Sequence, residues 1–376
     1  MKIPRFYADL GSFLKPNKVL VLYGPRQVGK TTLLKDYLDS SPYQYRLDSG
    51  EDIRVREILE FQDFAKIKEY ASGCELLAID EAQKVRNVGQ ALKIIVDQMP
   101  GIRVIATGSS SFELAGQVGE PLTGRKTTLT LYPVSQLEFA ELYTPFELRE
   151  RLEEFLIFGG YPEVAASSDR KEKAGLLTEI ASAYLLKDIL ALDRVKSSKI
   201  VLDLLRLLAF QIGSEVSLSE LAQKVGLDYK TVARYLDLLE KNFVIFTLRG
   251  YSRNLRNEMT KKAKYFFFDN GIRNALIANF NPLELRDDIG GLWENFMLLE
   301  RIKRQAYRAV PVNFYFWRTW EGREIDLIEE REGGLFAYEF KWTGKGREPG
   351  KFRDAYPNAE FEVVNRDNYL SFVGIP

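Results

Sequence analysis

The sequence predicts an α/β protein that begins with a doubly wound parallel sheet, a sheet with helices on both faces. Short apolar runs alternate with helical stretches through the first third of the chain, a pattern typical of parallel α/β sheets. Two of these runs, Leu76–Ile79 and Val104–Ala106, are continuously apolar, as expected for strands that are buried on both faces. Because 376 residues exceed one ordinary core, two or three domains are expected.

The elements of the first half follow in order along the chain. A helix is expected over Thr32–Leu38, directly after the first strand. From about residue 132 to 195 the pattern is mostly helical, with a break at the Gly-Gly-Tyr-Pro sequence of residues 159–162. Later boundaries are expected at Gly213 and at Asn281–Pro282. The expected strands are Val19–Tyr23, Gln44–Asp48, Leu76–Asp80, Ile102–Thr107 and Thr127–Leu131.

Two helices open the second half. The first begins with the capping residue Ser217 and ends at Gly226, and the second is expected over Tyr229–Asn242. The second helix has a buried stripe and three side chains off that stripe that could reach a DNA major groove. The stripe is Val232, Leu236 and Leu239, and the three side chains are Lys230, Thr231 and Arg234.

A mixed α/β region is expected to complete the chain. A strand over Phe243–Leu248 leads into a basic turn or wing over Arg249–Arg256. Beyond Pro282 the pattern predicts a helix over Gly291–Arg304, a hairpin-like pair of strands, a further strand and a last helix.

The composition excludes several kinds of chemistry. The chain has no histidine, which excludes histidine-based catalytic triads, general bases and metal ligands. A single cysteine, Cys74, permits neither an intrachain disulfide nor a structural zinc site, so any metal must be a hard ion with oxygen ligands. No apolar run approaches the roughly 20 residues that span a bilayer, and the first residues lack the features of a signal peptide. We therefore expect a cytoplasmic protein without a membrane role.

The charge distribution gives a weak indication of a nucleic-acid partner. The formal net charge is zero, which does not favour a polycationic nucleic-acid binder. Basic residues are nevertheless enriched over Tyr251–Arg273 and Lys341–Arg353. The stretch Arg253–Lys264 favours DNA contact, whereas Asp237 and Glu240 weaken it. Ordinary solvated surface charge remains the alternative.

A complete phosphate-binding motif occupies residues 24–31, Gly-Pro-Arg-Gln-Val-Gly-Lys-Thr, which fit G-x-x-x-x-G-K-[ST]. An apolar strand precedes the motif and a helix follows it, as this motif requires. Its glycines let backbone N–H groups close around phosphate oxygens, Lys30 can reach the β and γ phosphates, and the Thr31 hydroxyl can ligate Mg²⁺. A purely structural glycine-rich turn is the less favoured alternative, because chance matches at a strand-to-helix junction are rare.

An acidic pair supplies the second half of this chemistry. Asp80 and Glu81 end the apolar run that begins at Leu76. Asp80 can enter the Mg²⁺ shell, which leaves Glu81 to polarise an attacking water, and phosphoryl transfer needs both functions. The alternative, an ordinary helix start with two acids, does not account for the pairing with the upstream loop. ATP hydrolysis is the reaction that the two motifs predict.

Five segments together resemble the AAA+ ATPases, specifically the bacterial and archaeal AAA_14–DUF4143 group. They are residues 24–31, Leu77–Gln83, Thr107–Ser110, Leu122–Arg125 and Tyr132–Ser135. The resemblance implies a sensor of the γ-phosphate at Ser109 and, at Arg125, an arginine that acts on the nucleotide of a neighbouring subunit. It also implies self-association, with a hexamer as one candidate form. The turn at residues 159–162 resembles one that packs by the nucleotide in related switch-like ATPases.

This resemblance implies four parts of the chain and a set of site residues. The parts are an AAA+ P-loop core at 1–140, a helical lid at 141–197, a winged helix at 198–256 and a PD-(D/E)xK nuclease-like domain at 257–376. The expected catalytic residues are Lys30, Glu81, Ser109 and Arg125, and the expected Mg²⁺ ligands are Thr31 and Asp80. The expected nucleotide-binding residues are Gly24, Pro25, Arg26, Gln27, Val28, Gly29, Lys30, Thr31 and Thr32.

The last part carries a second set of charged residues. Alternation over residues 324–328 predicts that Glu324, Asp326 and Ile328 share one face of a strand, while Glu339 and Lys341 share a face of the next strand. The set resembles the PD-(D/E)xK nuclease site, in which Asp326 and Glu339 would bind Mg²⁺ or Mn²⁺ beside Lys341, with Glu294 as a candidate extra acid. The alternatives are a domain that keeps the fold as a DNA clamp and an exposed ladder of ion pairs.

Two functions remain open at this stage. The first is a DNA-associated ATPase in which hydrolysis drives or gates DNA binding through the C-terminal domains. The second is a regulatory switch that binds nucleotide and a protein or DNA partner without nuclease or motor activity. Stimulation of the ATPase rate by DNA would separate the two.

Overall fold

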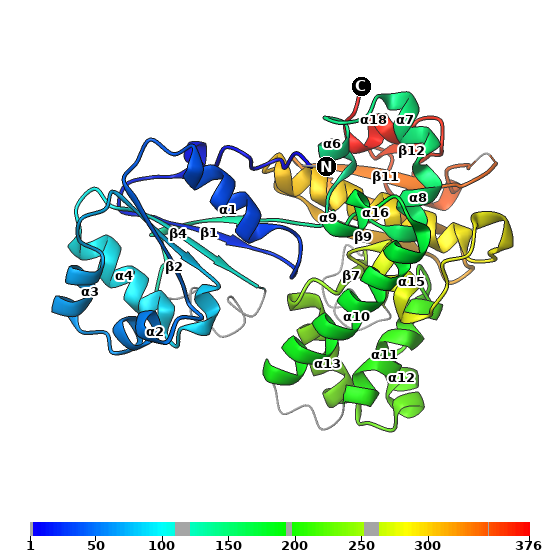
Figure 1. Ribbon diagram of the computed structural model, residues 1–376. Helices are drawn as coiled ribbons and strands as arrows, with labels where there is room; N and C mark the ends of the chain where they lie inside the picture. The colour runs from blue at the N-terminus through cyan, green and yellow to red at the C-terminus, as the bar shows by residue number, and fades with distance from the viewer. Residues whose placement is uncertain (1–2, 110–120, 193–197, 252–262, 345) are drawn as a thin grey trace. The chain divides into compact units, whose positions relative to one another are not determined.

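The computed structural model divides into two compact units, each with its own sheet and covering helices (Figure 1). The N-terminal unit is Arg5–Tyr132, and the C-terminal unit is Pro133–Pro376 together with the first four residues. The residues that the structure describes are 3–109, 121–192, 198–251, 263–344 and 346–376.

The sheet of the N-terminal unit is parallel throughout its described strands, in the order β2-β3-β4-β1-β5. Each strand lies within one residue of its predicted bounds, and the parallel α/β prediction for this part of the chain is confirmed. The strands are β1 (Val19–Tyr23), β2 (Tyr45–Ser49), β3 (Leu76–Asp80), β4 (Arg103–Gly108) and β5 (Lys126–Thr130).

Helices cover both faces of this sheet. On one face, alternate residues of β1, β3 and β4 form one buried core with α2, α3 and α4. On the other face, α1 packs against β4 and against the 3₁₀ turn η1. The helix predicted over Thr32–Leu38 begins earlier, at Lys30. The elements are η1 (Leu10–Phe13), α1 (Lys30–Asp39), α2 (Ile53–Glu60), α3 (Phe64–Tyr70), η2 (Ala82–Lys84) and α4 (Val88–Gln98).

The C-terminal unit begins with a run of helices, as the sequence predicts for residues 132–195. Capping boxes start two of them, where Ser135 and Thr144 each exchange hydrogen bonds with a glutamate three residues on. The helices are α6 (Gln136–Phe139), α7 (Pro145–Glu150), α8 (Leu152–Phe158), α9 (Pro162–Ala166), α10 (Arg170–Leu192) and α11 (Ser198–Phe210).

A mixed sheet organises the rest of this unit, with its described strands in the order β12-β11-β10-β9-β7-β8-β6. β7 is parallel to β9 and β11 is parallel to β12, while the other pairs are antiparallel. The strands are β6 (Glu215–Val216), β7 (Ile245–Gly250), β8 (Ala263–Phe267), β9 (Asn313–Arg318), β10 (Glu324–Arg331), β11 (Gly334–Phe340) and β12 (Glu360–Val364).

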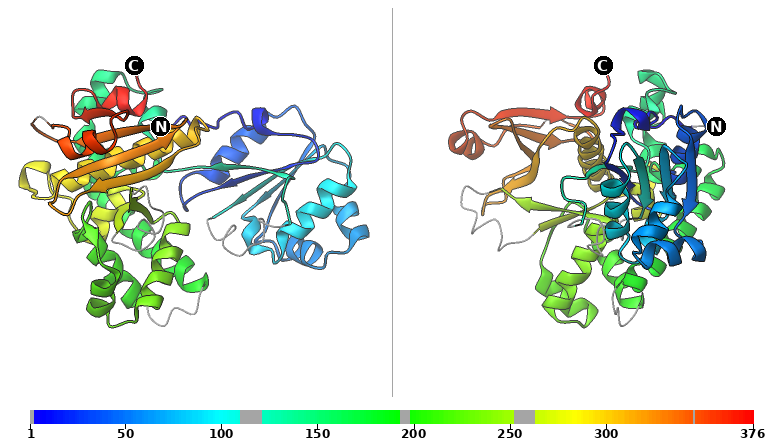
Figure 2. Two further views of the ribbon diagram at one scale, coloured as in Figure 1. Left: turned by 180° about the vertical axis from the view of Figure 1, so that it is seen from behind. Right: turned by 90° about the vertical axis from the view of Figure 1, so that its left-hand side faces the viewer.

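This sheet continues across the boundary expected between residues 256 and 257. β8 follows that boundary in sequence, yet it pairs with β6 and β7, which precede it. β7 also pairs with β9, so one sheet joins the two parts that the sequence separates. Figure 2 shows the strands from two further directions. The remaining elements are α12 (Leu218–Val225), α13 (Tyr229–Lys241), α15 (Asn270–Leu276), η3 (Leu283–Leu285), α16 (Ile289–Tyr307), α17 (Gly350–Ala355) and α18 (Tyr369–Val373).

One predicted strand face is wrong. The register of β10 against β9 shifts between Ile325 and Ile328, which marks a β-bulge or similar irregularity. Ile328 consequently shares a buried apolar cluster with Ile325 and does not lie with Glu324 and Asp326. An extra residue in one strand reverses the alternation of every side chain beyond it, and sequence alternation does not reveal it.

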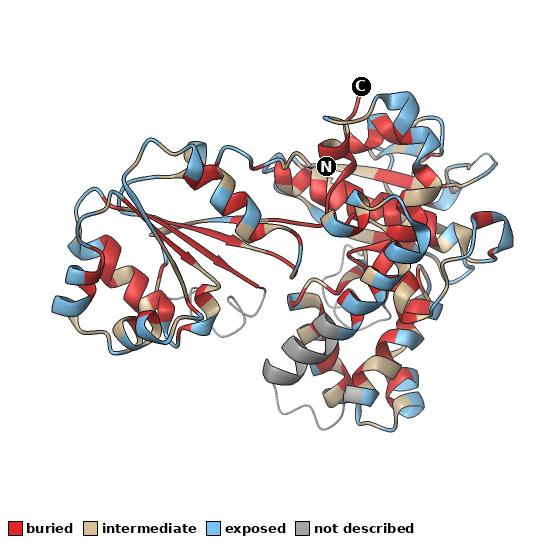
Figure 3. Ribbon diagram, viewed as in Figure 1, coloured by how far each residue is buried: buried red, intermediate tan, exposed pale blue. Residues whose placement is uncertain are grey.

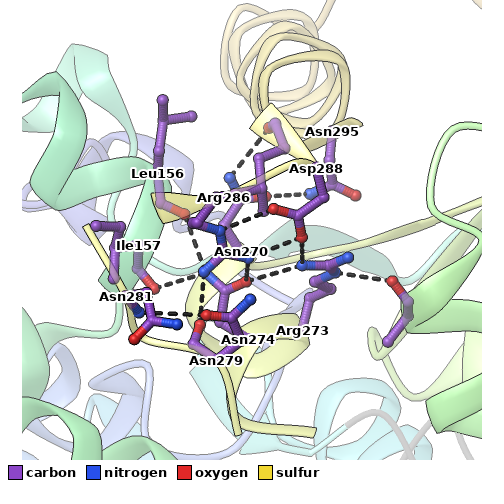
Figure 4. A network of polar contacts seen from close by, with 12 residues as sticks. Leu156, Ile157, Asn270, Arg273, Asn274, Asn279, Asn281, Arg286, Asp288 and Asn295 are labelled. Atoms are coloured by element: carbon purple, nitrogen blue, oxygen red, sulfur yellow. Dashed lines mark hydrogen bonds and ion pairs between the residues drawn. The ribbon is translucent and has the colours of Figure 1, made fainter. Parts of the chain in front are cut away.

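A buried polar network fastens α8 to the C-terminal elements (Figure 4). The Asn274 side chain donates to the carbonyls of Leu156 and Ile157, at 3.2 and 2.8 Å. Its own oxygen accepts from Arg273 and Arg286, and both of these arginines pair with Asp288. The network satisfies backbone carbonyls at the end of α8 that the helix itself leaves open.

Figure 3 shows that the inner strands β1, β3 and β4 of the N-terminal sheet are buried, while the outer faces of the helices are exposed. In the C-terminal sheet β8 is buried throughout, whereas β9 and β12 are partly exposed. Within the described ranges, no helix is both long enough and apolar enough to cross a membrane.

Candidate functional site

The phosphate-binding loop connects β1 to α1, as predicted. Gly24 and Gly29 both have positive φ angles, 149° and 91°. A Cβ atom on Gly24 would lie 2.0 Å from the carbonyl oxygen of Leu131, so only glycine fits at the start of the loop. The other residues predicted to bind nucleotide, Pro25, Arg26, Gln27, Val28 and Thr32, lie in the loop or in the first turn of α1.

Lys30 points into the loop. Its side chain is 5% exposed, and its Nζ atom donates to the carbonyl oxygens of Gly24 at 2.9 Å and Pro25 at 2.7 Å. Both acceptors belong to the loop, so the ammonium lies within its curve. This is the position from which a P-loop lysine reaches phosphate oxygens.

Thr31 and Asp80 meet at the ends of α1 and β3. The Thr31 hydroxyl donates to Asp80 Oδ2 at 2.8 Å. The other Asp80 oxygen accepts a hydrogen bond from the hydroxyl of Thr107, at the end of β4. A hydroxyl and a carboxylate in contact at this edge form the donor set that Mg²⁺ takes from protein at phosphate sites.

Glu81 is held by its backbone and its neighbours. Its φ angle is 50°, which is uncommon for a residue other than glycine and places the residue in the left-handed region. Its N–H donates to Thr107 Oγ1 at 3.2 Å, and its carboxylate accepts from the side-chain amide of Gln83. Strained backbone of this kind is concentrated at functional sites.

Sequence reasoning missed Thr107 and Arg5. Thr107 joins Asp80 to the Glu81 backbone, and the available signal was a hydroxyl within an otherwise apolar strand, where it is fully buried. Arg5 donates to the carbonyl of Val28 in the loop and to the carbonyl of Tyr132 at 2.6 Å. No sequence motif marks Arg5, because it acts on backbone atoms far along the chain.

The C-terminal unit brings a second set of charged side chains together. Oxygen atoms of Glu294, Glu324 and Asp326 all lie within 4.8 Å of one another. The ammonium of Lys264 is ion-paired with Glu294 at 2.9 Å and with Glu324. Glu339 lies beside them on β11 and is ion-paired with Lys341. We call Glu294, Glu324, Asp326 and Glu339 the carboxylate cluster.

The electrostatics of the carboxylate cluster reflect burial among like charges. Burial, which Lys264 opposes and the negative charge of Asp326 reinforces, raises the pKa of Glu294 to about 8. Burial also raises the pKa values of Asp326 and Glu339. Burial lowers the pKa of Lys264, but the attraction of Glu294 and Glu324 outweighs this effect and raises it overall. Lys264 therefore remains an ammonium ion within the carboxylate cluster.

Family models match three consecutive stretches of the chain. An AAA domain matches residues 16–140, and domains of unknown function match residues 149–283 (DUF8612) and 289–372 (DUF4143). The first match contains the loop, Asp80 and Glu81. The chain is a P-loop ATPase with an AAA domain and a C-terminal DUF4143 domain.

Relatives of this ATPase are found in bacteria and archaea. An uncharacterized protein of Mycobacterium tuberculosis is 27% identical over 86% of the chain and 70% of its own length. Uncharacterized proteins of Methanocaldococcus jannaschii and Haemophilus influenzae are each 26% identical, over 95% and 87% of the chain and 83% of their own lengths.

A solved structure, the Walker-type ATPase of Pyrococcus abyssi, superposes with a TM-score of 0.46 at 19% identity. The superposition covers 69% of this ATPase and 91% of that chain.

Two predicted catalytic residues of the ATPase lie at opposite ends of the strands of its sheet. Ser109 directly follows β4 and is 2% exposed. Arg125 directly precedes β5, and it is ion-paired with Asp97 of α4 at 2.6 Å. The loop follows the C-terminal end of β1, and β5 runs parallel to β1, so Arg125 lies at the N-terminal end of the strands, away from the loop. The five residues of β5, at about 3.3 Å each, separate the two ends, so Arg125 is too far away to reach the nucleotide of its own chain.

The turn at residues 159–162 of the ATPase packs against α15. A Cβ atom on Gly159 would lie 2.1 Å from Asp269 Oδ1, and the Gly160 N–H donates to Asp269 Oδ2 at 2.7 Å. The Gly160 carbonyl accepts from the N–H of Val134 at 2.7 Å. A Cβ atom on Gly160 would lie 2.3 Å from the Val134 carbonyl oxygen, so packing explains both glycines without a nucleotide. The predicted place of the turn beside the nucleotide stays a prediction.

The second predicted metal site does not fit a divalent ion. Asp326 Oδ2 already accepts from the N–H of Phe340 at 2.7 Å, and Glu339 Oε1 is paired with Lys341. Among the described residues, Glu339 Oε2 is buried and has no hydrogen-bond partner. It is a single oxygen, however, and a divalent ion there would stand beside the ammonium groups of both Lys341 and Lys264.

Proposed function

We propose that this ATPase couples ATP hydrolysis to DNA binding. In this proposal the N-terminal unit hydrolyses ATP with Mg²⁺, and the segment from α11 to β8 contacts duplex DNA. The observation that carries the DNA contact is the surface of α13, where Lys230 and Arg234 are exposed beside a buried stripe of Val232, Leu236 and Leu239.

The order of elements supports a winged helix in this segment. A helix, a short strand, two helices and two strands follow one another as α11, β6, α12, α13, β7 and β8, and β8 pairs with both β6 and β7. In such modules the third helix enters the major groove. The predicted wing, Arg249–Arg256, begins with Arg249 at the end of β7, and its residues after Tyr251, Arg253 and Arg256 among them, lie outside the described residues. Lys261 and Lys262, which follow the predicted wing in the basic stretch, also lie outside them.

Thr231, the third side chain predicted to reach DNA, is not among the proposed DNA contacts. Its hydroxyl donates to Asp228 Oδ2 at 2.6 Å, and its N–H donates to Asp228 Oδ1 at 2.9 Å. Asp228 thereby caps α13, and the Thr231 hydroxyl is engaged at the helix start. Lys230 and Arg234 are therefore the proposed DNA contacts.

The geometry of the loop supports the proposed catalytic roles. Lys30 would hold the β and γ phosphates, and Thr31 and Asp80 would hold Mg²⁺, which when bound neutralises charge that develops on the phosphate oxygens. Glu81 would orient the attacking water once its carboxylate leaves Gln83. Ser109, at the end of the neighbouring strand, would sense the γ-phosphate.

Steady-state ATPase with and without duplex DNA tests this function. We expect duplex DNA to raise the rate of the parental protein. The double variant Lys230→Glu/Arg234→Glu should lose this stimulation and most of the DNA affinity, because two phosphate contacts become repulsive. The slope of log affinity against log salt concentration is negative, and its magnitude should fall by about 2.

A matched control reverses two other exposed charges, with Lys66→Glu on α3 and Lys171→Glu on α10. This variant should keep the stimulation. An ATPase rate that no duplex, single-stranded or branched DNA alters would contradict the proposal and favour a nucleotide-dependent switch with a protein partner.

A further inference from the structure

A buried ammonium lies among the side chains of the carboxylate cluster. Lys264 is 1% exposed and pairs with Glu294 and Glu324, whose side chains are 14% and 25% exposed. Asp326 completes the group of three carboxylates that lie within 4.8 Å of one another. A lysine is almost never fully buried unless it is paired, so its position here requires these partners.

These side chains come from elements that are far apart along the chain. Lys264 lies on β8, Glu294 on α16, and Glu324 and Asp326 on β10. Arg318 of β9 adds a second cation, with Nη1 3.4 Å from Glu324 and 3.5 Å from Glu215 of β6. Through Arg318, ion pairs therefore connect β10 and β6, which lie at opposite sides of the sheet segment β10-β9-β7-β8-β6.

The surrounding backbone leaves no spare room beside Glu294. A Cβ atom on Gly213, which has a φ of 74°, would lie 2.6 Å from Glu294 Oε2. The turn before β6 therefore closes on the carboxylate from one side while Lys264 contacts it from another. The position of Glu294 is set by packing as well as by charge.

We propose that Lys264 is the resident cation of the carboxylate cluster and takes the place of a divalent metal. The contact of 2.9 Å to Glu294 is the ordinary length for an ammonium and a carboxylate. A divalent ion needs ligand oxygen atoms at 2.0–2.6 Å from it. Between Glu294, Glu324 and Asp326 such an ion would lie beside the Lys264 ammonium, and the two positive charges would repel each other. The DUF4143 part of the chain consequently keeps its fold without metal and performs no metal-dependent cleavage at this site.

Mn²⁺ binding in the absence of nucleotide tests the proposal. Full-length protein would be titrated with Mn²⁺ and free Mn²⁺ measured by electron paramagnetic resonance. Every protein would carry Asp80→Asn, so that the nucleotide site does not contribute. The set comprises this background, the background with Asp326→Asn, and the background with Lys264→Met, which keeps the volume of the side chain and removes its charge.

We expect no Mn²⁺ site that Asp326→Asn removes in the protein with Lys264. The Lys264→Met protein should gain one site per chain, at least 10-fold tighter than any in the background, and adding Asp326→Asn should abolish it. The melting temperature of the Lys264→Met protein should rise with Mn²⁺, while that of the background should not. A Lys264→Arg protein keeps the charge and should gain no site.

Two results would overturn the proposal. One is a Mn²⁺ site in the protein with Lys264 that disappears with Asp326→Asn, because the cluster would then hold metal beside the lysine. The other is a folded Lys264→Met protein that gains no site. Should Lys264→Met unfold, the comparison of the background with Asp326→Asn still decides, and refolding of the variant by Mn²⁺ alone would support the proposal.

Discussion

At the scale of single residues, the candidate ATP site depends on hydrogen bonds that hydroxyl groups make with acidic residues. Asp80 accepts from two hydroxyl groups, those of Thr31 and Thr107, which fix both of its oxygens. Thr107 also accepts from the N–H of Glu81, so one hydroxyl orients the two acidic residues together. Each acid thereby has a separate task, because Asp80 faces Thr31 while Glu81 is turned toward Gln83.

The first prediction concerns Glu81→Gln. The amide keeps the shape of the side chain but is a poor proton acceptor, so nucleotide binding should persist while turnover falls by about 100-fold or more. Steady-state ATPase and the binding of a fluorescent ATP analogue would measure the two effects. Lys30→Ala serves as the contrasting variant, since it should lose binding as well. Hydrolysis at the parental rate by Glu81→Gln would disprove the catalytic role.

The second prediction concerns Thr107→Val, which keeps the shape of the side chain and removes its hydroxyl. Asp80 and the Glu81 backbone would each lose a partner, and kcat should fall by about 10-fold or more. The KM for ATP should change less, because Lys30 and the loop stay intact. Thr130→Val, at the end of β5, which β1 separates from β4, is a matched control that should retain kcat. Equal kcat for Thr107→Val and the parent would show that the hydroxyl does not orient the site.

At the scale of elements, a polar network that contains two buried arginines connects α8, α15 and the start of α16. The side chains of Arg273 and Arg286 are 2% and 0% exposed, and both pair with Asp288. Burial raises the pKa of Asp288, but hydrogen bonds from Arg286 and Arg273 outweigh it and lower the pKa overall. Two buried guanidinium groups thus depend on one carboxylate.

The third prediction is that Asp288→Asn destabilises the C-terminal unit by about 3 kcal/mol, because it leaves buried charge without its counter-ion. Urea unfolding followed by tryptophan fluorescence would measure the change, with the exposed Asp287→Asn as the control. A lowered folded-state pKa means that the stabilisation is complete above the unfolded value and is lost as the pH falls through the folded value. The difference between parent and Asp288→Asn should therefore shrink below about pH 4, since the ordinary pKa is 3.8. A difference that persists unchanged at pH 2 would contradict this account.

At the scale of the whole molecule, the position of Arg125 bears on assembly. It lies at the N-terminal end of the parallel strands, opposite the loop, so it cannot reach the nucleotide bound by its own chain. We propose that Arg125 acts on the nucleotide of a neighbouring copy, which would require it to exchange its ion pair with Asp97 for a phosphate. Exposed ion pairs of this kind contribute little free energy, so the exchange would cost little.

The fourth prediction follows from this arrangement. Lys30→Ala and Arg125→Ala should each be inactive alone, because an arginine supplied by a neighbour contributes on the order of 10³-fold or more to related reactions. Mixed together, the two should recover part of the ATPase rate, since some interfaces combine an intact loop with an intact arginine. Absence of any recovery in a mixture shown to assemble by light scattering would rule out a shared site. Arg103→Ala, which also lies at that end of the strands, should retain activity by itself.

The sequence alone determined the parallel sheet of the N-terminal unit, the loop with Lys30 and Thr31, and the acids Asp80 and Glu81. Tertiary structure alone decided the role of Thr107, the contact of Arg5 with the loop, the merging of two expected domains into one sheet, and the bulge in β10. It also placed Lys264 between Glu294, the candidate extra acid of the predicted metal site, and Glu324, beside the predicted metal ligand Asp326. The reason is one of range: periodicity, caps and loop motifs are local consequences of backbone geometry and are visible in neighbouring residues. The pairing of β7 with β9, and of Lys264 with Glu294 and Glu324, depends instead on how elements far apart in the chain bury their surfaces together.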